Sequence, residues 1–476
     1  KNVCFYTRFR LCGSRENILD GALKMVGLTE QVFDVAVVGG GPAGLTHACY
    51  MALGGRKVIL FEQAVYPRHQ IGESLLPFSW DVFEEIQFAD KLKSAGFVEK
   101  HGARFYSERS HRGKIFRFAN SLNPKYPTIY HVGRDVFDEM LRDHAISLGV
   151  QVIQPHAVRS VTKDKDGITI DNTWRAKILV RASGITTAQV MPENYVPNAP
   201  EDNATGVYSY FKYTPKTGTI LDGDILIDLF YVDDASQVPC WAWAIPISQD
   251  IMSVGFVLRT HQFAKIRQEG LSLNEMGQKM LKLLPEVCDI IENVDEPLDD
   301  YRMRFNFQRV AKQIVFDREV LIGDAAGFID PVFSSGVHIG LNSARLSAMA
   351  INEALSDPAR FNPEPLEAFQ TNYRHLFWSY YRFVKMFYEK NLVEKLFLMT
   401  GEVTSETEDK LTYQLANEFT SILSGDIASP NSIIRSLDNA RLTINPDVRA
   451  VFEGSRTQEI PRPNMSSTPI MAPNAR

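Results

Sequence analysis

Three glycines, Gly39, Gly41 and Gly44, have the spacing of a loop that holds a phosphate-bearing cofactor. A β-branched run precedes them and an apolar run follows, so the pattern predicts a strand, a tight turn and a helix. In such a loop the first glycine permits the turn, the second lets the backbone approach a pyrophosphate, and the third lets the helix pack on the strand. The helix N-terminus adds free N–H groups. The residues expected to contact the cofactor here are Gly39, Gly41, Pro42, Ala43 and Gly44.

An acidic residue stands at the distance that a dinucleotide ribose requires. Glu62 follows Gly39 by 23 residues and comes just after the apolar run 58–61. Its carboxylate can accept hydrogen bonds from a ribose diol, and Gln63 beside it is expected to contact the same group. The loop and this acid together predict a dinucleotide-binding βαβ unit.

A second glycine turn, Gly323-Asp324, follows another apolar run and precedes a helix. A carboxylate at this point can hold a sugar or ribityl hydroxyl while the helix N-terminus faces a phosphate or a ring carbonyl. The alternative is an ordinary N-cap aspartate.

Ser334, Ser335 and Gly336 stand immediately before a further helix-like run. Several backbone N–H groups in such a turn can surround a small anion. A plain turn is the alternative. Trp241 and Trp243 alternate along one predicted strand face, where two indoles form either a packed core face or a rigid apolar wall.

The elements that must position these residues predict an α/β fold. Strand and helix alternate over 33–62, whereas 205–260 reads as an antiparallel sheet with apolar alternation. One helix is expected over 79–95 and another over 134–148. The aromatic-rich segment 365–400 is expected to be helical, and it could wall a substrate site, cap a cofactor, or form an aromatic core or oligomer interface. A loop containing Glu73 and Ser74 is either a turn or a cofactor contact.

Composition excludes several classes of partner. The net charge of −6 gives no reason to expect nucleic acid, and no basic block suggests a membrane surface. The 5 cysteines are scattered without metal-ligand spacing, which favours a reducing compartment and argues against a metal site. No apolar run reaches bilayer-spanning length. The sequence therefore predicts a soluble, cytoplasmic protein.

Three separated motifs carry a family resemblance over residues 33–400. The segment Pro67–Pro77, containing Gly-Glu-Ser-Leu-Leu-Pro, the strand Trp241-Ala-Trp-Ala-Ile-Pro246, and the loop Asp330-Pro-Val-Phe-Ser-Ser-Gly336 resemble those of the FAD-dependent halogenases. These enzymes are part of the flavin monooxygenase superfamily with the para-hydroxybenzoate hydroxylase-like fold. The resemblance implies an enzyme that uses reduced FAD, O2 and chloride, bromide or iodide to make hypohalous acid, which halogenates an electron-rich aromatic substrate.

The resemblance also implies roles for particular residues. The halide would bind at Ser334, Ser335 and Gly336, with the backbone at Gly336 and Val337 against the flavin ring. Trp241 and Trp243 would separate the flavin from the substrate. Arg134 matches a position where the superfamily often places an arginine near the flavin ring, the alternative being a solvated surface arginine. The implied FAD-contacting set is Gly39, Gly41, Pro42, Ala43, Gly44, Glu62, Gln63, Arg134, Gly323, Asp324, Gly336 and Val337.

The implied architecture is a Rossmann-like FAD-binding domain with an inserted antiparallel β-sheet substrate domain and a C-terminal helical region. The division expected is an N-terminal extension at 1–30, an FAD-binding domain made of 31–200 and 300–360, a substrate domain at 201–299, a helical region at 361–453 and a disordered tail at 454–476.

The chain departs from the family pattern at two points. No lysine stands immediately around the Gly-Glu-Ser segment, although the family uses a lysine to position or capture the acid. The candidates are Lys91 and Lys93 on the following helix, with Lys57 upstream. Phe333 occupies the place where tryptophan halogenases have a glutamate, which points to the phenol/pyrrole-type branch.

A single dinucleotide fingerprint is present, so the hypothesis is a two-component enzyme supplied by a separate NAD(P)H:flavin reductase. The substrate would be an aromatic small molecule, free or bound to a carrier protein. One alternative is an FAD-dependent monooxygenase, epoxidase or geranylgeranyl-type reductase of the same superfamily that does not halogenate. Another is an FAD-binding scaffold without activity.

Overall fold

The computed structural model describes most of the chain. The described residues are 32–199, 202–214, 223–232, 238–305, 307–357, 360–390, 392–393, 395, 406–429 and 431–452. The expected extension at 1–30 and the expected tail at 454–476 lie outside these ranges.

The first sheet carries the predicted βαβ unit. Among the described residues it has eight strands in the order β17-β18-β10-β1-β2-β7, with a β8–β9 hairpin attached to β10. The strands from β18 to β7 are parallel. The apolar runs of β1, β2, β10 and β18 are mostly buried, as expected for a sheet covered on both faces, whereas β7 at the edge is partly exposed. The bounds are β1 Val32–Val38, β2 Val58–Phe61, β7 Gln151–Ile153, β8 Val161–Asp164, β9 Gly167–Ile170, β10 Trp174–Arg181, β17 Val315–Phe316 and β18 Glu319–Leu321.

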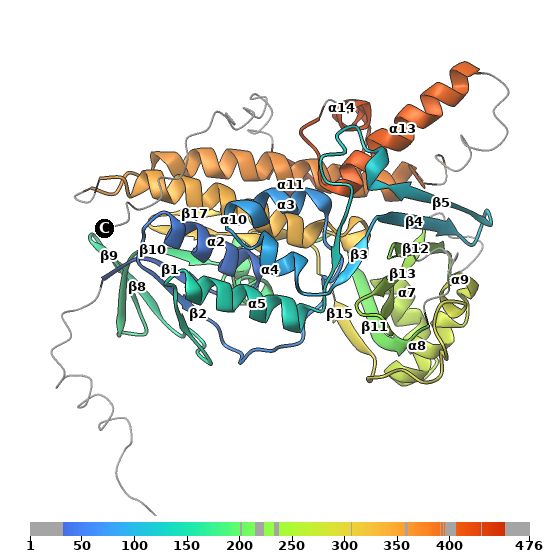
Figure 1. Ribbon diagram of the computed structural model, residues 1–476, viewed down its shortest axis with the longest axis horizontal. Helices are drawn as coiled ribbons and strands as arrows, with labels where there is room; N and C mark the ends of the chain where they lie inside the picture. Colours follow the sequence, from blue (N-terminus) through green and yellow to red (C-terminus); the bar gives the residue numbers. More distant parts are fainter. Residues whose placement is uncertain are drawn as a thin grey trace, which may run out of the picture.

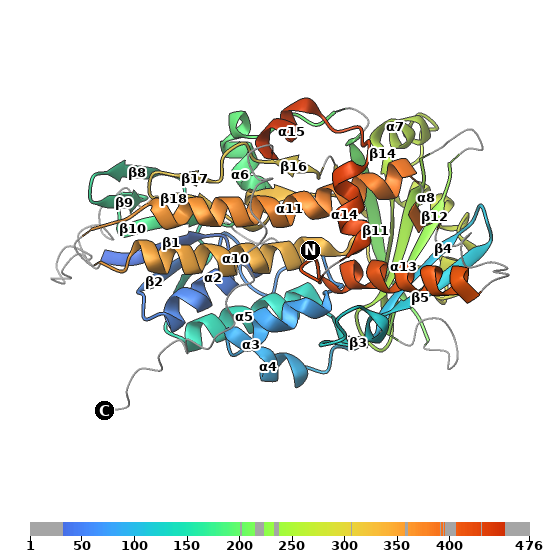
Figure 2. The same ribbon diagram turned by 90° about the horizontal axis from the view of Figure 1, so that it is seen from above.

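Helices cover this sheet in layers. Helix α2 (Pro42–Leu53) packs against α5 (Arg134–Ser147) and α10 (Ser335–Ala354), and the long α11 (Glu364–Lys390) runs alongside α10 (Figures 1 and 2). The prediction of a single helix over 79–95 is wrong. The segment divides into α3 (Trp80–Glu85) and α4 (Ala89–Lys93) because Gln87 adopts a left-handed backbone conformation with a φ of 60°, which a helix cannot accommodate.

The second sheet lies beside the first and is mainly antiparallel. In the described ranges it has seven strands in the order β15-β11-β14-β13-β12-β4-β5, and only β12 and β4 are parallel neighbours. The strands expected within 205–260 form its centre, while β4, β5 and β15 come from flanking parts of the chain. The bounds are β4 Gly102–Ser107, β5 Arg112–Arg117, β11 Ala204–Lys212, β12 Ile225–Phe230, β13 Cys240–Pro246, β14 Ile251–Arg259 and β15 Arg302–Phe305.

The two faces of the second sheet pack against different cores. One face, with Ala242 and Ala244, packs on three short helices, whereas the other, with Trp241 and Trp243, joins the main core. This alternation follows from the two-residue period of a strand. The short helices are α7 Thr260–Arg267, α8 Leu273–Leu281 and α9 Pro285–Cys288.

A small strand pair lies between the two sheets (Figure 1). Strand β3 (Val98–Lys100) pairs antiparallel with β6 (Ile129–His131), and Ser74 forms an isolated antiparallel bridge to His131 on the other side of β6. The Gly-Glu-Ser segment is thereby held as an extended edge beside β6.

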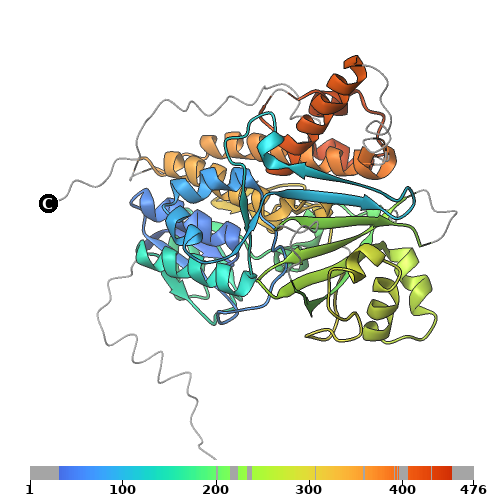
Figure 3. The same cartoon turned by 45° about the vertical axis from the view of Figure 1, so that its right-hand side comes forward.

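Helix α13 (Glu406–Ser424) lies over the β4–β5 edge of the second sheet (Figure 3). Phe419 on α13 packs against Phe105, Phe116 and Phe333, which closes an aromatic cluster over β4 and β5. Among the helices that the structure describes, none combines the length and apolar character needed to cross a bilayer. The remaining elements are α6 Ile185–Val190, α13 Glu406–Ser424, α14 Ser432–Asn439, α15 Pro446–Phe452, β16 Arg309–Val310 and β19 Gly327–Phe328.

Candidate functional site

The glycine loop joins β1 to α2 in the way that the spacing predicts. Gly39 has a φ of 112°, and a Cβ there would overlap the carbonyl of Ala182 on the neighbouring strand end. A Cβ on Gly44 would overlap the carbonyl of Gly39, so the helix packs directly on the turn. In front of Gly41 the nearest atom that a Cβ would meet is Arg68 Nη2 at 3.9 Å. The backbone at Gly41 is therefore open to a ligand.

Glu62 holds the glycine loop from the end of β2. Its Oε2 accepts a hydrogen bond from the Gly40 N–H at 2.7 Å, and its Oε1 accepts one from the Ala64 N–H at 2.9 Å. The side chain is buried, whereas Gln63 beside it is exposed. The acid thus lies at the edge of the loop, where the sequence predicts a ribose contact.

Arg68 supplies positive charge to this loop, and the sequence reasoning missed it. Its Nη2 donates to the Gly40 carbonyl at 3.0 Å, and its Nη1 lies 3.3 Å from Asp138 Oδ2. Nε lies 3.7 Å from Glu62 Oε1, and within the described part of the chain neither Nε nor Nη1 completes a hydrogen bond beyond these ion-pair contacts. Buried guanidinium donors rarely stay unsatisfied, and a pyrophosphate is a suitable acceptor for them. The only sequence feature that could have indicated Arg68 is its position next to Pro67 in the segment that resembles the halogenases.

Gly323 and Asp324 meet the glycine loop from the other side. A Cβ on Gly323, which has a φ of 57°, would lie 2.8 Å from the Ala43 Cβ. Asp324 lies inside a short 3-10 helix whose N-cap is Ile322, so it is not an N-cap aspartate. Burial raises the pKa of the Asp324 carboxyl, and Arg309 and Arg134 oppose that shift. Its side chain nevertheless keeps 43% of its surface accessible, as expected of a residue that lines a ligand cavity.

Arg134 begins α5 and is buried, which corrects the alternative of a solvated surface arginine. Its Nε and Nη2 donate to the two carboxylate oxygens of Asp138 at 2.8 and 2.9 Å, and its Nη1 donates to the Ile71 carbonyl at 2.6 Å. A Cβ on Gly72 would lie 3.1 Å from Arg134 Nη1 and 3.6 Å from Val337. Arg134, Gly72 and Val337 therefore come together, as a shared flavin contact requires.

The Asp330–Gly336 loop leads into α10. Ser334 has a left-handed φ of 55°, and the Asp330 carboxylate accepts a hydrogen bond from the Val332 N–H at 3.2 Å. In the ranges described, Ser335 Oγ is buried without a hydrogen-bond partner. A Cβ on Gly336 would lie 3.1 Å from Phe328. Left-handed backbone followed by a helix start turns successive N–H groups in one direction, which suits an anion.

The two tryptophans are connected to this loop through the aromatic helix. The Trp241 indole N–H donates to Tyr388 Oη at 2.9 Å, and Tyr388 Oη donates to Asp330 Oδ2 at 2.7 Å. The Trp241 and Trp243 rings lie 5.6 Å apart. Most aromatic side chains of α11 are buried in the main core, in agreement with the core alternative for this helix.

Phe333 also belongs to the core and brings no charge to the loop. Its ring lies 4.5 Å from Phe383 and 5.4 Å from Phe387.

The lysines chosen from the sequence do not reach this region. Lys91 Nζ lies 2.9 Å from His144 Nδ1, and Lys93 Nζ lies over the Trp80 ring at 5.4 Å. Both contacts belong to the layer of α3, α4 and α5. Lys57 is exposed before β2. The structure therefore does not bring these residues together with Trp241 and Trp243.

Lys100 is the lysine that the sequence reasoning missed. It ends β3, is 1% exposed, and donates from Nζ to the Leu75 carbonyl at 2.9 Å. Leu75 belongs to the Gly-Glu-Ser-Leu-Leu segment, so a lysine does stand beside that segment in space. Nζ also lies 5.2 Å from the Phe118 ring. Burial lowers the pKa of Lys100 to about 7, with a smaller opposing effect from Asp224.

Glu73 ties the same segment to the second sheet. Its Oε1 accepts a hydrogen bond from Tyr210 Oη at 2.8 Å. Burial raises the pKa of Glu73 to about 7, against the hydrogen bonds from Tyr210 and Ser253. Ser253 also accepts the indole N–H of Trp243 at 3.3 Å. The segment is thus an extended connection between the two sheets rather than a simple turn.

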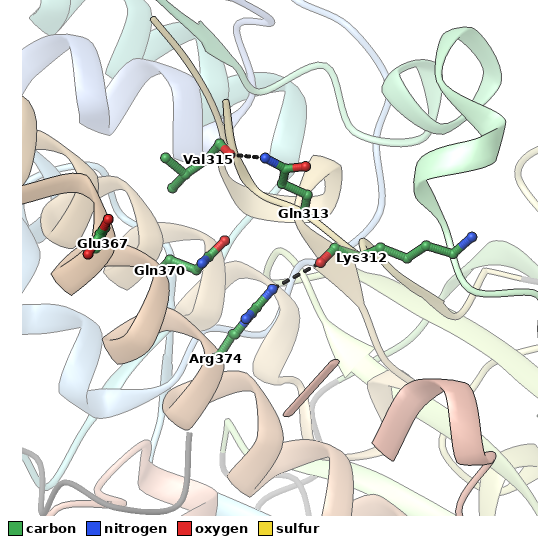
Figure 4. A pocket seen from close by; sticks show the side chains of 6 residues that line it. All are labelled: Lys312, Gln313, Val315, Glu367, Gln370 and Arg374. Carbon is green, nitrogen blue, oxygen red and sulfur yellow. Dashed lines mark hydrogen bonds between the residues drawn. The ribbon is translucent and has the colours of Figure 1, made fainter. Parts of the chain in front are cut away.

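A surface hollow of about 390 Å³ lies elsewhere, between the segment 312–315 and α11 (Figure 4). Arg374 bridges its floor by donating to the Lys312 carbonyl at 2.9 Å. None of its lining residues belongs to the glycine loop, the tryptophan strand or the Asp330–Gly336 loop. The hollow is therefore separate from the candidate FAD and halide sites. The lining residues are Lys312, Gln313, Val315, Glu367, Gln370 and Arg374.

Comparisons with known proteins agree with this geometry. The family model described as an FAD binding domain matches residues 32–183, and the one described as tryptophan halogenase matches residues 231–417. A 1H-pyrrole-2-carbonyl-[peptidyl-carrier protein] chlorinase of Pseudomonas fluorescens is 29% identical over 395 residues, which cover 78% of this chain and 87% of that protein.

Two solved structures have a similar fold. The myxobacterial chondrochloren halogenase, an FAD-dependent enzyme, gives a TM-score of 0.65 at 26% identity, covering 89% of this chain and 97% of that one. A flavoprotein/dehydrogenase from Cytophaga hutchinsonii gives a TM-score of 0.73 at 23% identity, covering 89% of this chain and 100% of that one.

Proposed function

Because the chain belongs to the flavin-dependent halogenases, we propose that it oxidises a halide and uses the resulting hypohalous acid to halogenate an electron-rich aromatic ring. The observation that carries the proposal is Lys100. It is a buried lysine whose Nζ donates to the Leu75 carbonyl of the Gly-Glu-Ser-Leu-Leu segment. No short-range motif in the sequence points to it.

FAD would be held by the first sheet and its loops. The glycine loop and Arg68 would bind the pyrophosphate, Glu62 the ribose, and Asp324 the ribityl chain, and Arg134 and Val337, which meet at Gly72, would contact the ring. When bound and reduced, FAD supplies the reaction with O2 that oxidises halide. The protein contributes binding, orientation and exclusion of water.

The halide would bind at the start of α10. The left-handed backbone at Ser334 lets the N–H groups of Ser335 and Gly336 point toward one anion, and the buried Ser335 hydroxyl would be a further donor. Trp241 and Trp243 would close the passage between this site and the ring of the substrate.

Lys100 would hold the hypohalous acid on the substrate side. Its ammonium group has three N–H bonds and gives one to Leu75, so others are available to polarise the acid. Because its pKa is about 7, a share of the side chain is also a neutral amine that can be halogenated.

The substrate class and partners follow from the same family. We assign FAD mainly to 31–200 with 300–360, and a covering role to 361–453. The substrate is assigned to 201–299 together with β3 to β6, whose residues 98–131 lie within the first of these ranges. Phe333 in place of a glutamate favours a phenol or pyrrole over tryptophan, free or carried by a protein, as the name of the Pseudomonas relative suggests. One dinucleotide fingerprint supports a separate NAD(P)H:flavin reductase, and such a pair would work in the cytoplasm.

The test is direct. Purified protein is incubated with FAD, a flavin reductase, NADH, a panel of phenols and pyrroles, and chloride, bromide or iodide. Halogenated product by mass spectrometry is expected only when reductase and halide are both present. Oxygenated product that contains no halogen would overturn the proposal in favour of a hydroxylase. Oxidation of NADH without added reductase would contradict the two-component arrangement.

A further inference from the structure

Three side chains lie on one face of the small strand group between the sheets. Ser74 is directly opposite His131 in an antiparallel bridge, and His131 is directly opposite Val98 on β3. Residues directly opposite share a face, and so do residues two apart on one strand. Lys100 is two residues after Val98. Ser74, His131 and Lys100 therefore face the same side.

His131 carries a free lone pair toward that side. Its Nε2 lies 2.9 Å from the Gly223 carbonyl, which can only accept, so Nε2 bears the hydrogen and Nδ1 is the basic nitrogen. His131 is fully buried, and among the described residues Nδ1 has no hydrogen-bond partner. Ser74 Oγ is likewise buried and without a partner in the ranges described.

Two buried polar atoms without a partner on neighbouring strands can both be satisfied by a polar group bound between them.

The charged groups around His131 keep the imidazole neutral. Burial and the ammonium of Lys100 lower its pKa well below the ordinary value, while the hydrogen bond to Gly223 opposes this. Asp224 follows Gly223 and forms an ion pair with Arg117 from β5. The Phe118 ring beneath the Lys100 ammonium adds an apolar surface. The result is a base, a hydroxyl and an N–H donor beside an aromatic wall.

We propose that Ser74, His131 and Lys100 bind a hydroxyl group on the aromatic ring of the substrate, and that His131 Nδ1 takes the proton of that hydroxyl during halogenation. A ring hydroxyl donates one hydrogen bond, to Nδ1, and accepts others, from Lys100 Nζ and Ser74 Oγ. A pyrrole N–H donates but has no lone pair to accept, so it satisfies only one of the three. This inference rests on the proposed halogenation and narrows its substrate to a phenol.

A ring carbon bonds to the halogen of hypohalous acid as the oxygen–halogen bond breaks, and the phenolic proton moves to Nδ1. The hydroxide that leaves takes this proton and becomes water. The proton on the halogenated carbon then moves to the oxygen, which restores the aromatic phenol. Phenol and hypohalous acid give halophenol and water.

The first test measures binding without turnover. Protein loaded with oxidised FAD is titrated with 2-naphthol and with 2-methoxynaphthalene, followed by probe fluorescence. Wild type is expected to bind 2-naphthol about 10-fold more tightly, the worth of one or two hydrogen bonds. His131→Gln keeps a donor for Gly223 but loses the basic nitrogen, and it should lose this preference, as should Ser74→Ala. Tyr130→Phe, on the opposite face of β6 against Trp80, should retain it. No preference in wild type would overturn the inference.

The second test measures turnover of a phenol that wild type halogenates. His131→Gln is expected to lower kcat/KM about 100-fold, the usual effect of removing a general base, and to remove the acid limb of the kcat profile against pH. Tyr130→Phe should match wild type, and unchanged FAD absorbance would show that the variants are folded. Full activity in His131→Gln would overturn the role of the base. A wild type that makes no halogenated product would instead contradict the proposed function and leave the binding test standing.

Discussion

The hydroxyl of Tyr388 donates a 2.7 Å hydrogen bond to Oδ2 of Asp330, the first residue of the loop before α10. The same hydroxyl accepts the indole N–H of Trp241 at 2.9 Å. All three side chains are buried. Burial raises the pKa of the Asp330 carboxyl, and Arg259 and these hydrogen bonds partly oppose the shift. The Tyr388 side chain at the end of α11 therefore joins the proposed halide loop to the strand that carries Trp241.

Tyr388→Phe is expected to lower the free energy of unfolding by about 1–3 kcal/mol, because Asp330 and Trp241 each lose a buried partner. Urea unfolding followed by tryptophan fluorescence measures this. Tyr380→Phe on the same helix is the matched control, since its hydroxyl has no hydrogen-bond partner among the described residues, and it should change the value by less than about 0.5 kcal/mol. Equal losses in the two variants would contradict the bridging role.

Lys100→Met is expected to reduce halogenated product by at least about 100-fold, as when one polarising donor is removed from an active site. Reduced flavin should still react with O2, so NADH consumption should continue. Lys91→Ala and Lys93→Ala should stay within about 2-fold of wild type, because their contacts are with His144 and Trp80. Product formation would be followed by mass spectrometry. If Lys100→Met still forms halogenated product, another residue must polarise the hypohalous acid.

Lys100 should also make stability depend on pH. Its pKa is about 7 when folded and 10.5 ordinarily, so between these values the unfolded chain binds more protons than the folded one. Above pH 10.5 Lys100 is neutral in both states and does not lower the free energy of unfolding. As the pH falls from 10.5 through 7, the unfolded chain gains a proton that the folded chain binds only weakly, so the folded state loses stability. The difference in unfolding free energy between Lys100→Met and wild type should therefore be largest near pH 7 and shrink toward pH 10. Parallel stability curves across this window would show that the lysine is not desolvated.

Arg68→Met is expected to weaken FAD binding by about 10- to 100-fold, the loss of one charge-assisted hydrogen bond of about 1.5–3 kcal/mol. Quenching of flavin fluorescence on titration gives the Kd. Arg267→Met is a suitable control, because Arg267 is exposed on α7, where it donates to the Leu271 carbonyl, and should leave the Kd unchanged. A weak effect at Arg68 would mean that its buried N–H groups do not face the pyrophosphate.

Gly336→Val is expected to abolish halide-dependent turnover while FAD binding stays nearly intact. Even a Cβ at Gly336 would lie 3.1 Å from Phe328, so a branched side chain must displace the first turn of α10 where the halide would bind. Rates against halide concentration are compared with those of Met349→Ala, an exposed position on the same helix. Turnover that persists in Gly336→Val would remove Ser334–Gly336 from the halide site.

Local patterns predicted much of this structure. The glycine loop and the tryptophan strand each depend on residues close together in the sequence, and each folds as its spacing indicates. At Gly323 the turn forms, but a three-residue 3-10 helix and the short strand β19 follow it in place of the expected helix. The position of Lys100 beside the Gly-Glu-Ser segment could not be predicted from local patterns. Lys100 comes 27 residues after Glu73, and its place beside Leu75 depends on the pairing of β3 with β6 and of β6 with Ser74. Likewise, β4 and β5 join the second sheet through a parallel contact with β12 that no local signal announces.

The extended strand of Glu73 and Ser74 has a consequence for how the enzyme can change its choice of substrate. Successive residues on it point to opposite sides, Glu73 toward Tyr210 and Ser74 toward the side of His131 and Lys100. The two sides of this strand therefore contact different residues. We expect replacements on the β3 and β6 side to alter which aromatic compounds are accepted, while the hydrogen bond of Glu73 to Tyr210 on the other side is retained.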